Sequence, residues 1–394
     1  MYTPYLPDSV DGASLSARNL VRCLRQRGVA VTVCTTDFNW SAADLARTAP
    51  KNLLIFRCWF RHLLEPAPGM ITFLARQLSF FDVIHFQGFF SLGTVLGAHL
   101  ARYRGRPYLI SPLGNMVPRW RERRAVSRGT AKYLYSHLLA RRALKGADRI
   151  ICASEMEEEV TRRFLKTDNM MWIPNGVNIE EYARDVPREL LERQWGIPAN
   201  EKIFLYLGRL SREKNLEFLL EAWDTAKGAG MPGTLVLAGA DIYNQGYQEH
   251  LKGIAASLRH PTDVLLPGSV TGDLKQALLQ HSVCLLLPSH RESFGNVVLE
   301  SLAAGTPVIA STGTPWQCLE DVGLGRWLPW DRQAWAEAMM AAATNGFPPP
   351  QEFMRHSRRW VAEKYSWEKS ADQYLEVYQQ VINDTGGGEP LGAM

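Results

Sequence analysis

The sequence predicts an α/β protein of two domains, each built on a parallel β-sheet that helices cover on both faces. Its 394 residues exceed the length at which a single hydrophobic core stops growing, so two domains are expected. Short apolar runs alternate with amphipathic helical patterns along the whole chain, which is typical of strand–helix units. Most of these runs are apolar throughout, as in the buried strands of parallel sheets.

Six apolar runs in the first half predict strands, at residues 29–35, 53–57, 82–87, 107–111, 148–153 and 170–174. Between them, stretches such as LSARNLVRCLRQRG repeat apolar residues at helical spacing and end in glycine. The opening residues MYTPYLPDSVDG instead predict a loop that leads into the first helix. Because a parallel sheet normally has a buried strand before such a loop, we expect the first strand to be missing or truncated. Its neighbours would then have unpaired backbone groups.

The second half repeats this rhythm, with apolar runs at 203–208, 234–239, 263–268, 282–288 and 306–311. The segment 174–202 contains an Asn-Gly turn, prolines and charges but no apolar run, and so predicts the domain boundary. We expect a first domain at 1–178, a second at 179–366, a closing amphipathic helix at 367–382 and a flexible tail at 383–394.

The composition, with 46% hydrophobic and 21% charged residues, is that of a soluble protein able to bury two cores. The net charge of +4 suits an anionic ligand or membrane surface without requiring nucleic acid. The six cysteines form no CxxC pair and the nine histidines no HxxxH spacing, so we expect buried thiols and no structural zinc. No apolar run reaches the ~18 residues that span a bilayer, and no signal pattern opens the chain, which favours a cytoplasmic protein.

The loop after the strand at 203–208 carries two cations, Arg209 and Lys214, in the stretch YLGRLSREKN. In open α/β sheets, ligands bind outside the carboxyl ends of the strands, which is where this loop is expected. Arginine offers a planar fork and lysine a point charge, and together they suit a diphosphate. A solvated charged loop is the alternative, because Arg212 and Glu213 lie between the two.

The strongest chemical signal is RESFGNVVLE, in which Glu292 and Glu300 flank a glycine and an apolar run. Ser293 and Gly295 open a predicted helix that Gly305 ends, and the amides at its start form an anion-binding end. Glu292 precedes this helix and Glu300 lies within it, so the two carboxylates are not expected to act on one bond. Binding two hydroxyl-bearing parts of one ligand suits them better. The alternative is helix capping by Glu292 and solvation of Glu300.

Several motifs occur in an order and spacing that one enzyme family shares. They are DG at 11–12, SEMEEE after ADRIICA, IPNGVNIEEY, GRLSREKN, VLLPGSV, ESFGNVVLE and YSWEKSADQYLEVY. Through them, most of the chain resembles the family 4 glycosyltransferases of the GT-B fold, retaining enzymes that use nucleotide-diphosphate sugars. The resemblance implies two Rossmann-like, doubly wound domains facing a central cleft, with the closing helix crossing back to the first domain.

The resemblance places the donor in the second domain. Arg209 and Lys214 would hold the diphosphate and stabilise its charge as it leaves, while Glu292 would bind hydroxyls of the donor sugar. Glu300 would bind the ribose, and the nucleobase would lie near Val270. The residues whose backbone would surround the sugar and phosphates are Phe294, Gly295, Asn296 and Val297.

The first domain would contribute the amide of Gly12, which would reach the phosphates when the cleft closes. The family retains anomeric configuration without an obvious protein nucleophile, and its leaving phosphate is thought to take the acceptor proton. Cations and amides aimed at the developing charge would then have the largest catalytic effect. No metal or other cofactor is expected, because the family needs none and the sequence lacks an Asp-x-Asp cation motif.

Two positions of the first domain depart from the family pattern. Many relatives carry a histidine near the position of Leu113, so one expected contact to the donor sugar is absent. His85, in the strand DVIHFQ, is a candidate replacement, with a structural histidine as the alternative. Asp11 stands where relatives have a glycine, which is unfavourable beside a diphosphate unless it points away or meets the acceptor. Candidate contacts to the acceptor or donor sugar are therefore Asp11, His85 and Asn115.

The segment 119–142, RWRERRAVSRGTAKYLYSHLLARR, is strongly basic with interleaved aromatic residues. Three interpretations stay open: docking on anionic lipid headgroups, reception of a lipid-linked diphosphate acceptor, and a solvated helix face. No recognition motif accompanies it, so nucleic acid is not an expected partner. The expected partners are a nucleotide sugar, a sugar or lipid-linked acceptor and the anionic inner face of a membrane.

The predicted function is transfer of a sugar from a UDP-sugar or GDP-mannose to a hydroxyl group, in polysaccharide or glycolipid synthesis, with retention of configuration. Two alternatives stay open. A catalytically weak pseudo-enzyme would bind the nucleotide sugar without turnover, and a pseudo-glycosyltransferase would couple non-sugar cyclitols on the same fold. The presence of Arg209, Lys214, Glu292 and Glu300 favours the enzyme.

Overall fold

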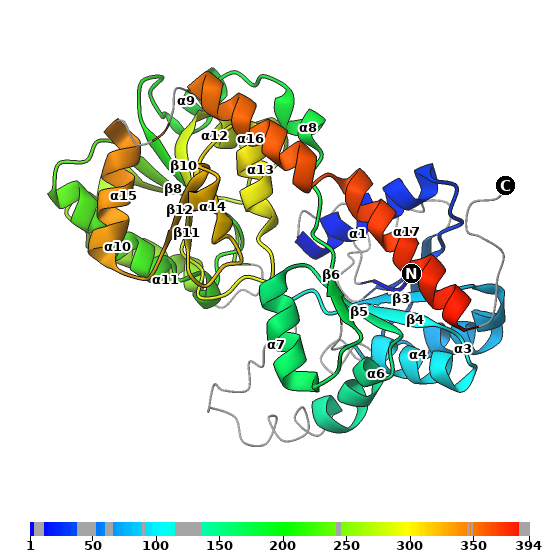
Figure 1. The fold of residues 1–394 in the computed structure, drawn as a ribbon. Coiled ribbons are helices and arrows are strands. Elements are labelled where there is room, and N and C mark those ends of the chain that lie inside the picture. Colours follow the sequence, from blue (N-terminus) through cyan, green and yellow to red (C-terminus); the bar gives the residue numbers. More distant parts are fainter. Residues whose placement is uncertain are drawn as a thin grey trace. The chain divides into compact units, whose positions relative to one another are not determined.

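The chain folds into two compact units (Figure 1). The computed structural model describes residues 1–3, 12–37, 53–59, 66–88, 91–114, 135–241, 246–344, 347 and 350–385. The first unit comprises Met1–Gly176 and Trp367–Met394, and the second comprises Val177–Ser366. The division lies close to the expected boundary at 178/179, and the closing helix is part of the first unit. Residues 386–394 of the expected tail lie outside the described residues.

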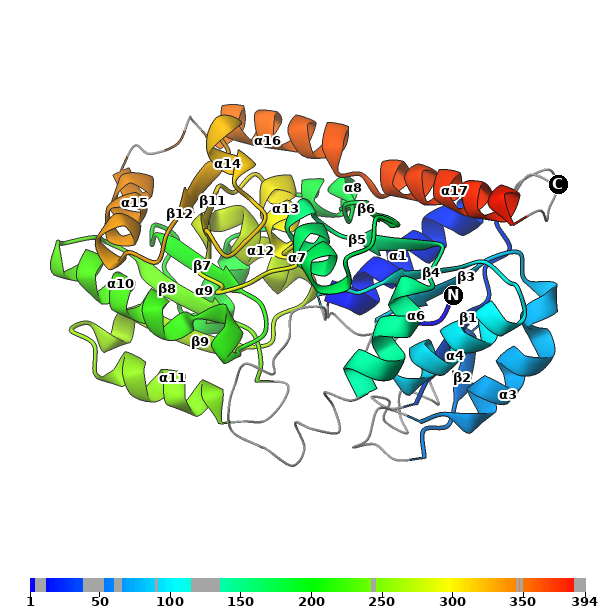
Figure 2. The ribbon, with the colours of Figure 1, turned by 60° about the horizontal axis from the view of Figure 1, so that its bottom comes forward.

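The first unit has parallel strands between two sets of helices (Figure 2). Its strands are β1 (Val33–Thr36), β2 (Leu53–Phe56), β3 (Ile84–Gln87), β4 (Tyr108–Ser111), β5 (Arg149–Cys152) and β6 (Met170–Trp172). Its helices are α1 (Gly12–Gln26), α3 (Pro68–Gln77), α4 (Leu92–Tyr103), α6 (Arg141–Lys145), α7 (Glu155–Leu165) and α17 (Trp367–Asp384), with shorter turns at Leu78–Phe80 and Tyr135–Ala140.

A short extended segment, residues 1–3, joins the two parts of this sheet. Tyr2 forms parallel bridges with Cys34 of β1 and with Phe86 of β3. Its carbonyl accepts a hydrogen bond from the Gln87 amide at 2.8 Å. The strands therefore follow the order β2, β1, residues 1–3, β3, β4, β5, β6. At the position where a missing or truncated strand was expected, three residues therefore form a short extended segment that pairs the backbone of both neighbours.

The sheet of the first unit has a separate apolar cluster on each face. On one face, Tyr2 and Phe86 pack with residues of α3, α4 and α6. On the other face, Leu109 of β4 packs with residues of α1 and α17, including Leu20 and Tyr378. Polar contacts support this second layer, since the Ser370 hydroxyl donates to the Pro174 carbonyl at 2.7 Å. The closing helix is thus an integral layer of the first unit.

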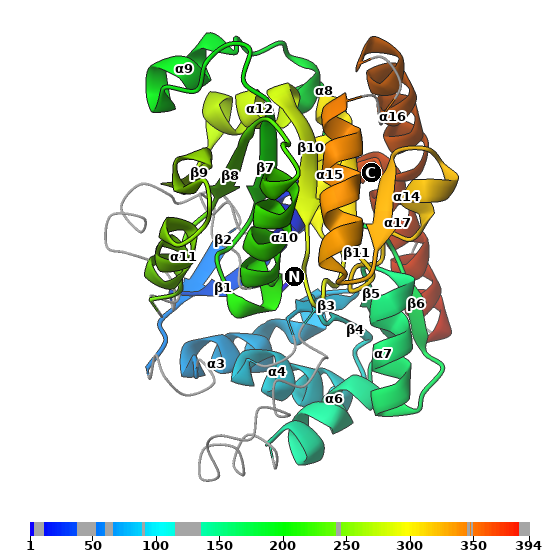
Figure 3. The same cartoon turned by 90° about the vertical axis from the view of Figure 1, so that its left-hand side faces the viewer.

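The second unit contains a six-stranded parallel sheet in the order β12-β11-β10-β7-β8-β9 (Figure 3). Its strands are β7 (Ile203–Leu207), β8 (Thr234–Ala238), β9 (Val264–Gly268), β10 (Ser282–Leu287), β11 (Val308–Ser311) and β12 (Gly325–Leu328). Its helices are α8 (Ile179–Ala183), α9 (Glu189–Trp195), α10 (Leu216–Gly228), α11 (Tyr247–Ala256), α12 (Gly272–His281), α13 (Asn296–Ala304), α14 (Cys318–Asp321), α15 (Arg332–Thr344) and α16 (Pro350–Lys364), with shorter turns at Arg212–Lys214 and Pro261–Asp263.

Strand β12 was not predicted. It is a four-residue edge strand whose residues are mostly half-buried or exposed, and Arg326 interrupts its apolar pattern. It pairs with β11 in parallel register, Val308 opposite Gly325. An edge strand packs on fewer neighbours than a central one, so its sequence need not be apolar throughout.

All six cysteines are free, and all but Cys318 are buried, as expected. Within the described residues, the helices include none with both the length and the apolar character needed to cross a bilayer.

Gly239, just after β8, permits a close approach of two strand ends. It has a φ of +156°, and a Cβ atom there would lie 1.7 Å from the carbonyl oxygen of Gly208. Gly239→Ala should therefore lower the free energy of unfolding by roughly 2 kcal/mol or more through overpacking. Urea unfolding followed by circular dichroism measures this.

Gly253 is the matched control, because it lies inside α11 and no atom stands within 4 Å of its virtual Cβ. Gly253→Ala should raise the free energy of unfolding by about 0.5–1 kcal/mol. Equal stability of the two variants would contradict the close approach at Gly239.

Candidate functional site

The loops after β7 and β10 lie side by side at the carboxyl edge of the second sheet. The two strands pair directly, Leu205 opposite Leu285. Beyond their ends, the His290 amide donates to the Glu213 carbonyl at 2.9 Å and ties the loops together. The strand order reverses between β7 and β10, and open α/β sheets bind ligands at such a switch point. One loop carries Arg209 and Lys214 and the other carries Glu292.

Lys214 and Glu292 form an ion pair, and each side chain is only 12% exposed. The Ser289 hydroxyl also donates to Glu292 Oε1 at 3.0 Å. The Glu292 amide donates to the Gly313 carbonyl at 3.0 Å, which connects this loop to the one after β11. Two residues singled out in separate sequence motifs therefore meet, with the Glu292 carboxylate held by Lys214 and Ser289 and its backbone amide tied to the loop after β11.

Tyr206 lies beneath the same loops and was not predicted as a site residue. Its hydroxyl donates to the Arg209 carbonyl at 2.6 Å. Burial raises the pKa of Tyr206, the Glu292 carboxylate raises it further, and Arg209 opposes them. Tyr206 is therefore neutral at physiological pH and acts as a hydrogen-bond donor that orients the Arg209 backbone.

Helix α13 begins beside this pair, at Asn296, as predicted. Gly295 precedes it with a φ of +85°, and Gly305 follows it with a φ of +91°. The indole nitrogen of Trp316 donates to the Phe294 carbonyl at 2.5 Å, so a buried aromatic residue holds the turn. Amides in the first turn of a helix have no partner within the helix and form its positive end.

Glu300 lies inside α13 and is 6% exposed. It contacts different residues from Glu292. Its Oε2 lies 2.8 Å from Lys275 Nζ. Burial raises the pKa of Tyr182, and the nearby Glu300 carboxylate raises it further. The two glutamates therefore have different basic partners, in agreement with separate roles rather than a shared bond. Val270, also predicted here, is buried in the loop after β9.

The loop after β11 supports the site and was missed in the sequence. A Cβ on Gly313 would lie 2.4 Å from the His290 carbonyl oxygen and 2.5 Å from that of Ser289. From beyond β12, the Trp330 indole donates to the Pro288 carbonyl at 2.9 Å. The sequence does contain a signal for this loop, because the strand predicted at 306–311 must end at the same edge of the sheet.

His85 is hydrogen-bonded inside the first unit through both nitrogens of its ring. Its Nδ1 lies 2.7 Å from the Tyr378 hydroxyl and its Nε2 lies 2.8 Å from Ser111 Oγ. Burial lowers the pKa of His85 to about 3, so the ring is neutral. Because both ring nitrogens have partners inside the first unit, the structural alternative is the one that the contacts support.

The remaining first-unit predictions fall partly outside the described residues. Asp11, Asn115 and residues 119–134 of the basic segment lie there. Gly12 is the exposed first residue of α1, and its carbonyl accepts from the Ser16 hydroxyl at 2.8 Å. In the part of the chain that the structure describes, no three His, Cys, Asp or Glu side chains are grouped to hold a metal ion.

Glu157, in the SEMEEE motif, is a buried carboxylate that links the ends of β4 and β5. It accepts hydrogen bonds from the Gly114 amide and, at 2.7 Å, from the Ala153 amide. Burial raises the pKa of Glu157, and these two hydrogen bonds oppose that effect. Leu113, just before Gly114, has a φ of +54°, a strained conformation for a leucine.

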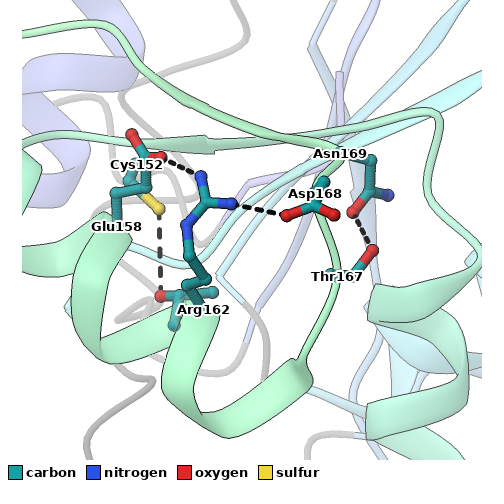
Figure 4. A network of polar contacts seen from close by, with 7 residues as sticks. Cys152, Glu158, Arg162, Thr167, Asp168 and Asn169 are labelled. Atoms are coloured by element: carbon teal, nitrogen blue, oxygen red, sulfur yellow. Dashed lines mark hydrogen bonds and ion pairs between the residues drawn. The ribbon is translucent and has the colours of Figure 1, made fainter.

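Further along α7, polar contacts hold the helix in place (Figure 4). Arg162 bridges Glu158 and Asp168, and the Cys152 thiol donates to a buried threonine hydroxyl of the helix at 3.8 Å. Glu157, in the first turn of this helix, holds the loop after β4 through the Gly114 amide.

Glu157→Gln should loosen residues 112–114. A glutamine side chain has one acceptor oxygen, so one of the two amides loses its partner at a cost of roughly 1.5–3 kcal/mol. Hydrogen–deuterium exchange at Gly114 and Ala153 should become faster. Glu159→Gln is the control, because Glu159 is exposed and pairs with Arg163 along the helix. Unchanged exchange in both variants would show that Glu157 does not hold the loop.

Two family models match the chain. Residues 10–181 match the model described as Glycosyltransferase Family 4, and residues 187–318 match Glycosyl transferases group 1. An uncharacterized glycosyltransferase of Methanocaldococcus jannaschii is 26% identical over 97% of each chain. The alpha-monoglucosyldiacylglycerol synthase of Streptococcus pneumoniae is 28% identical over 79% of this chain and 70% of its own.

A solved structure shows the same fold. The Anabaena protein HepE in complex with UDP-glucose superimposes with a TM-score of 0.73 at 18% identity, over 96% of this chain and 98% of that one. Together with the two parallel-sheet units and the motifs of the second unit, these matches show that the chain belongs to the GT-B glycosyltransferases of the family 4 type.

Proposed function

We propose that the protein transfers a sugar from a nucleotide-diphosphate donor to a hydroxyl acceptor with retention of configuration and without a metal ion. The observation that carries this proposal is the nearly buried Lys214–Glu292 pair at the switch point of the second sheet. A cation, a carboxylate and a helix N-terminus at one strand edge offer complementary groups for a diphosphate that carries a sugar.

The donor would bind to the second unit in two parts. Arg209, Lys214 and the first amides of α13 would face the diphosphate, and Glu292 would accept hydrogen bonds from hydroxyls of the transferred sugar. Glu300, with Lys275 at 2.8 Å, would accept those of the ribose. The separate basic partners of the two glutamates, Lys214 and Lys275, support this division.

In the chemical step, the bond between the anomeric carbon and the phosphate oxygen breaks, and its electron pair stays on the leaving phosphate. Arg209 and Lys214 would stabilise the charge that develops there, which is the role a metal ion has in other enzymes. The acceptor oxygen forms the new bond to the anomeric carbon on the face from which the phosphate leaves. Its proton passes to that phosphate, so no protein nucleophile is required.

UDP-glucose bound to the Anabaena relative supports a UDP-sugar as the donor, with GDP-mannose as the alternative to test. The streptococcal relative, a glucosyldiacylglycerol synthase by name, supports a glycolipid or related polysaccharide product. We infer a cytoplasmic enzyme that meets a lipid-linked or sugar acceptor at the inner membrane face, where the basic segment 119–142 would contact anionic headgroups.

Thermal-shift screening against UDP, GDP, ADP and their sugars tests the donor assignment, because a ligand that binds only the folded state raises its stability. Release of nucleoside diphosphate from the donors that bind then tests turnover. Nucleotide-sugar binding without release on any acceptor would favour the pseudo-enzyme. Absence of any nucleotide binding would overturn the proposed function.

Glu292→Gln and Glu300→Gln should have different effects. Glu300→Gln removes charged hydrogen bonds to the ribose and deprives Lys275 of its partner, so nucleotide Kd should rise about tenfold or more. Glu292→Gln should lower kcat more than it weakens nucleotide binding, since it contacts the transferred sugar. Calorimetry with the free nucleotide measures the change in Kd, and steady-state kinetics measure the change in kcat.

Glu337→Gln, on the exposed surface of α15, is the control for loss of one negative charge. It should leave both quantities unchanged. If Glu292→Gln and Glu300→Gln weakened nucleotide binding equally, the division of the donor site between them would be wrong.

A further inference from the structure

The first unit has its own topological switch point, between the segment 1–3 and β3. On one side the chain continues to β1 and β2, and on the other to β4, β5 and β6. Ligands of open α/β sheets bind outside the carboxyl ends of the strands at such a point. Because Tyr2 bridges Phe86, the side chains that follow them at this edge are those of Thr3 and Gln87.

These two side chains have unsatisfied polar atoms. Thr3 is 0% exposed and Gln87 is 3% exposed, and neither Thr3 Oγ1 nor Gln87 Oε1 has a hydrogen-bond partner among the described residues. Buried polar atoms are nearly always paired, and an orphan costs roughly 1–3 kcal/mol. Two orphans at neighbouring positions of one strand edge therefore indicate a missing hydrogen-bonding group.

Both side chains lie on the same face of the sheet. Successive residues of a strand point to opposite faces, and Tyr2 and Phe86 face the cluster of α3 and α4. Thr3 and Gln87 therefore share the face of His85, whose ring contacts α17. The imidazole has no free nitrogen, so the polar atom of this strand without a partner in the described part of the chain is two residues further on, at Gln87 Oε1.

We propose that Thr3 and Gln87 form a subsite that binds a hydroxyl group of the sugar acceptor. This proposal rests on the proposed function. The orphan on Gln87 is an acceptor oxygen and the threonine hydroxyl can accept or donate, so an uncharged hydroxyl satisfies both whereas an anion would be repelled. Neither group is a base at neutral pH, so the subsite orients the acceptor and leaves its proton to the departing phosphate.

Thr3→Val and Gln87→Met test the subsite, because each removes the polar atom and nearly keeps the shape. Removing an orphan should leave the melting temperature unchanged or raise it. Each variant should raise the acceptor KM about three- to tenfold, with kcat at saturating acceptor and nucleotide Kd unchanged. Thr161→Val is the control, since its hydroxyl already accepts a hydrogen bond from Cys152 elsewhere in the unit.

A second measurement needs no donor. Ligand-observed NMR with glucose, galactose, mannose and myo-inositol should detect binding to the wild-type protein and a weaker signal with both variants. This separates the two proposals, because failure of the proposed function appears as loss of nucleotide binding in the second unit. Absence of sugar or inositol binding to the wild type would overturn the subsite alone.

Three further outcomes would also overturn it. If both variants melt at lower temperature and bind acceptor normally, the two oxygens hold only an ordered water. If nucleotide binding weakens in parallel with acceptor binding, the groups serve the donor. If Thr161→Val raises the acceptor KM as much as the other two, the effect is a general one of altering the core.

Discussion

Parallel pairing of β7 with both β8 and β10 is the constraint on which the candidate site of the second unit depends. The strand order reverses between β7 and β10, so the loops that follow these two strands leave the carboxyl edge of the sheet at neighbouring positions. Arg209 and Lys214 thereby come to lie on the loop beside Glu292, although about eighty positions separate them in the chain. The loop that contains Gly313 packs against the loop after β10, and the Trp330 indole donates a hydrogen bond to the Pro288 carbonyl of that loop.

The candidate site of the second unit contains charged side chains that are nearly buried. A nearly buried carboxylate is costly unless it is paired, and Glu292 meets this condition through Lys214 and Ser289. Under the proposed function, a diphosphate would replace the carboxylate as partner of the lysine, and sugar hydroxyls would replace the lysine as partners of the carboxylate. Lys214 and Glu292 thus satisfy one another with the same groups that the proposed donor would use.

Among the described residues of the first unit, the buried side chains of His85 and Glu157 are hydrogen-bonded and form no ion pair with each other or with a cation. His85 is neutral and bonded at both nitrogens, and Glu157 lies between two backbone amides instead of beside a cation. Both are satisfied within the unit and serve its architecture. By contrast, Thr3 Oγ1 and Gln87 Oε1 have no hydrogen-bond partner in the part of the chain that the structure describes. The sequence instead indicates the histidine, because His85 lies near the carboxyl end of a predicted strand and relatives carry a histidine near the position of Leu113.

The sequence by itself determined the α/β class, eleven of the strand positions, the boundary near residue 178 and the motifs of the second unit, because apolar periodicity and turn residues are local properties. It did not show strand β12, the pairing of residues 1–3, the supports at Gly313 and Trp316 or the bonded state of His85. Each of these depends on which distant segments become neighbours across a sheet. Only tertiary structure decides that, since the hydrogen bonds and burial that define such positions come from residues remote in the chain.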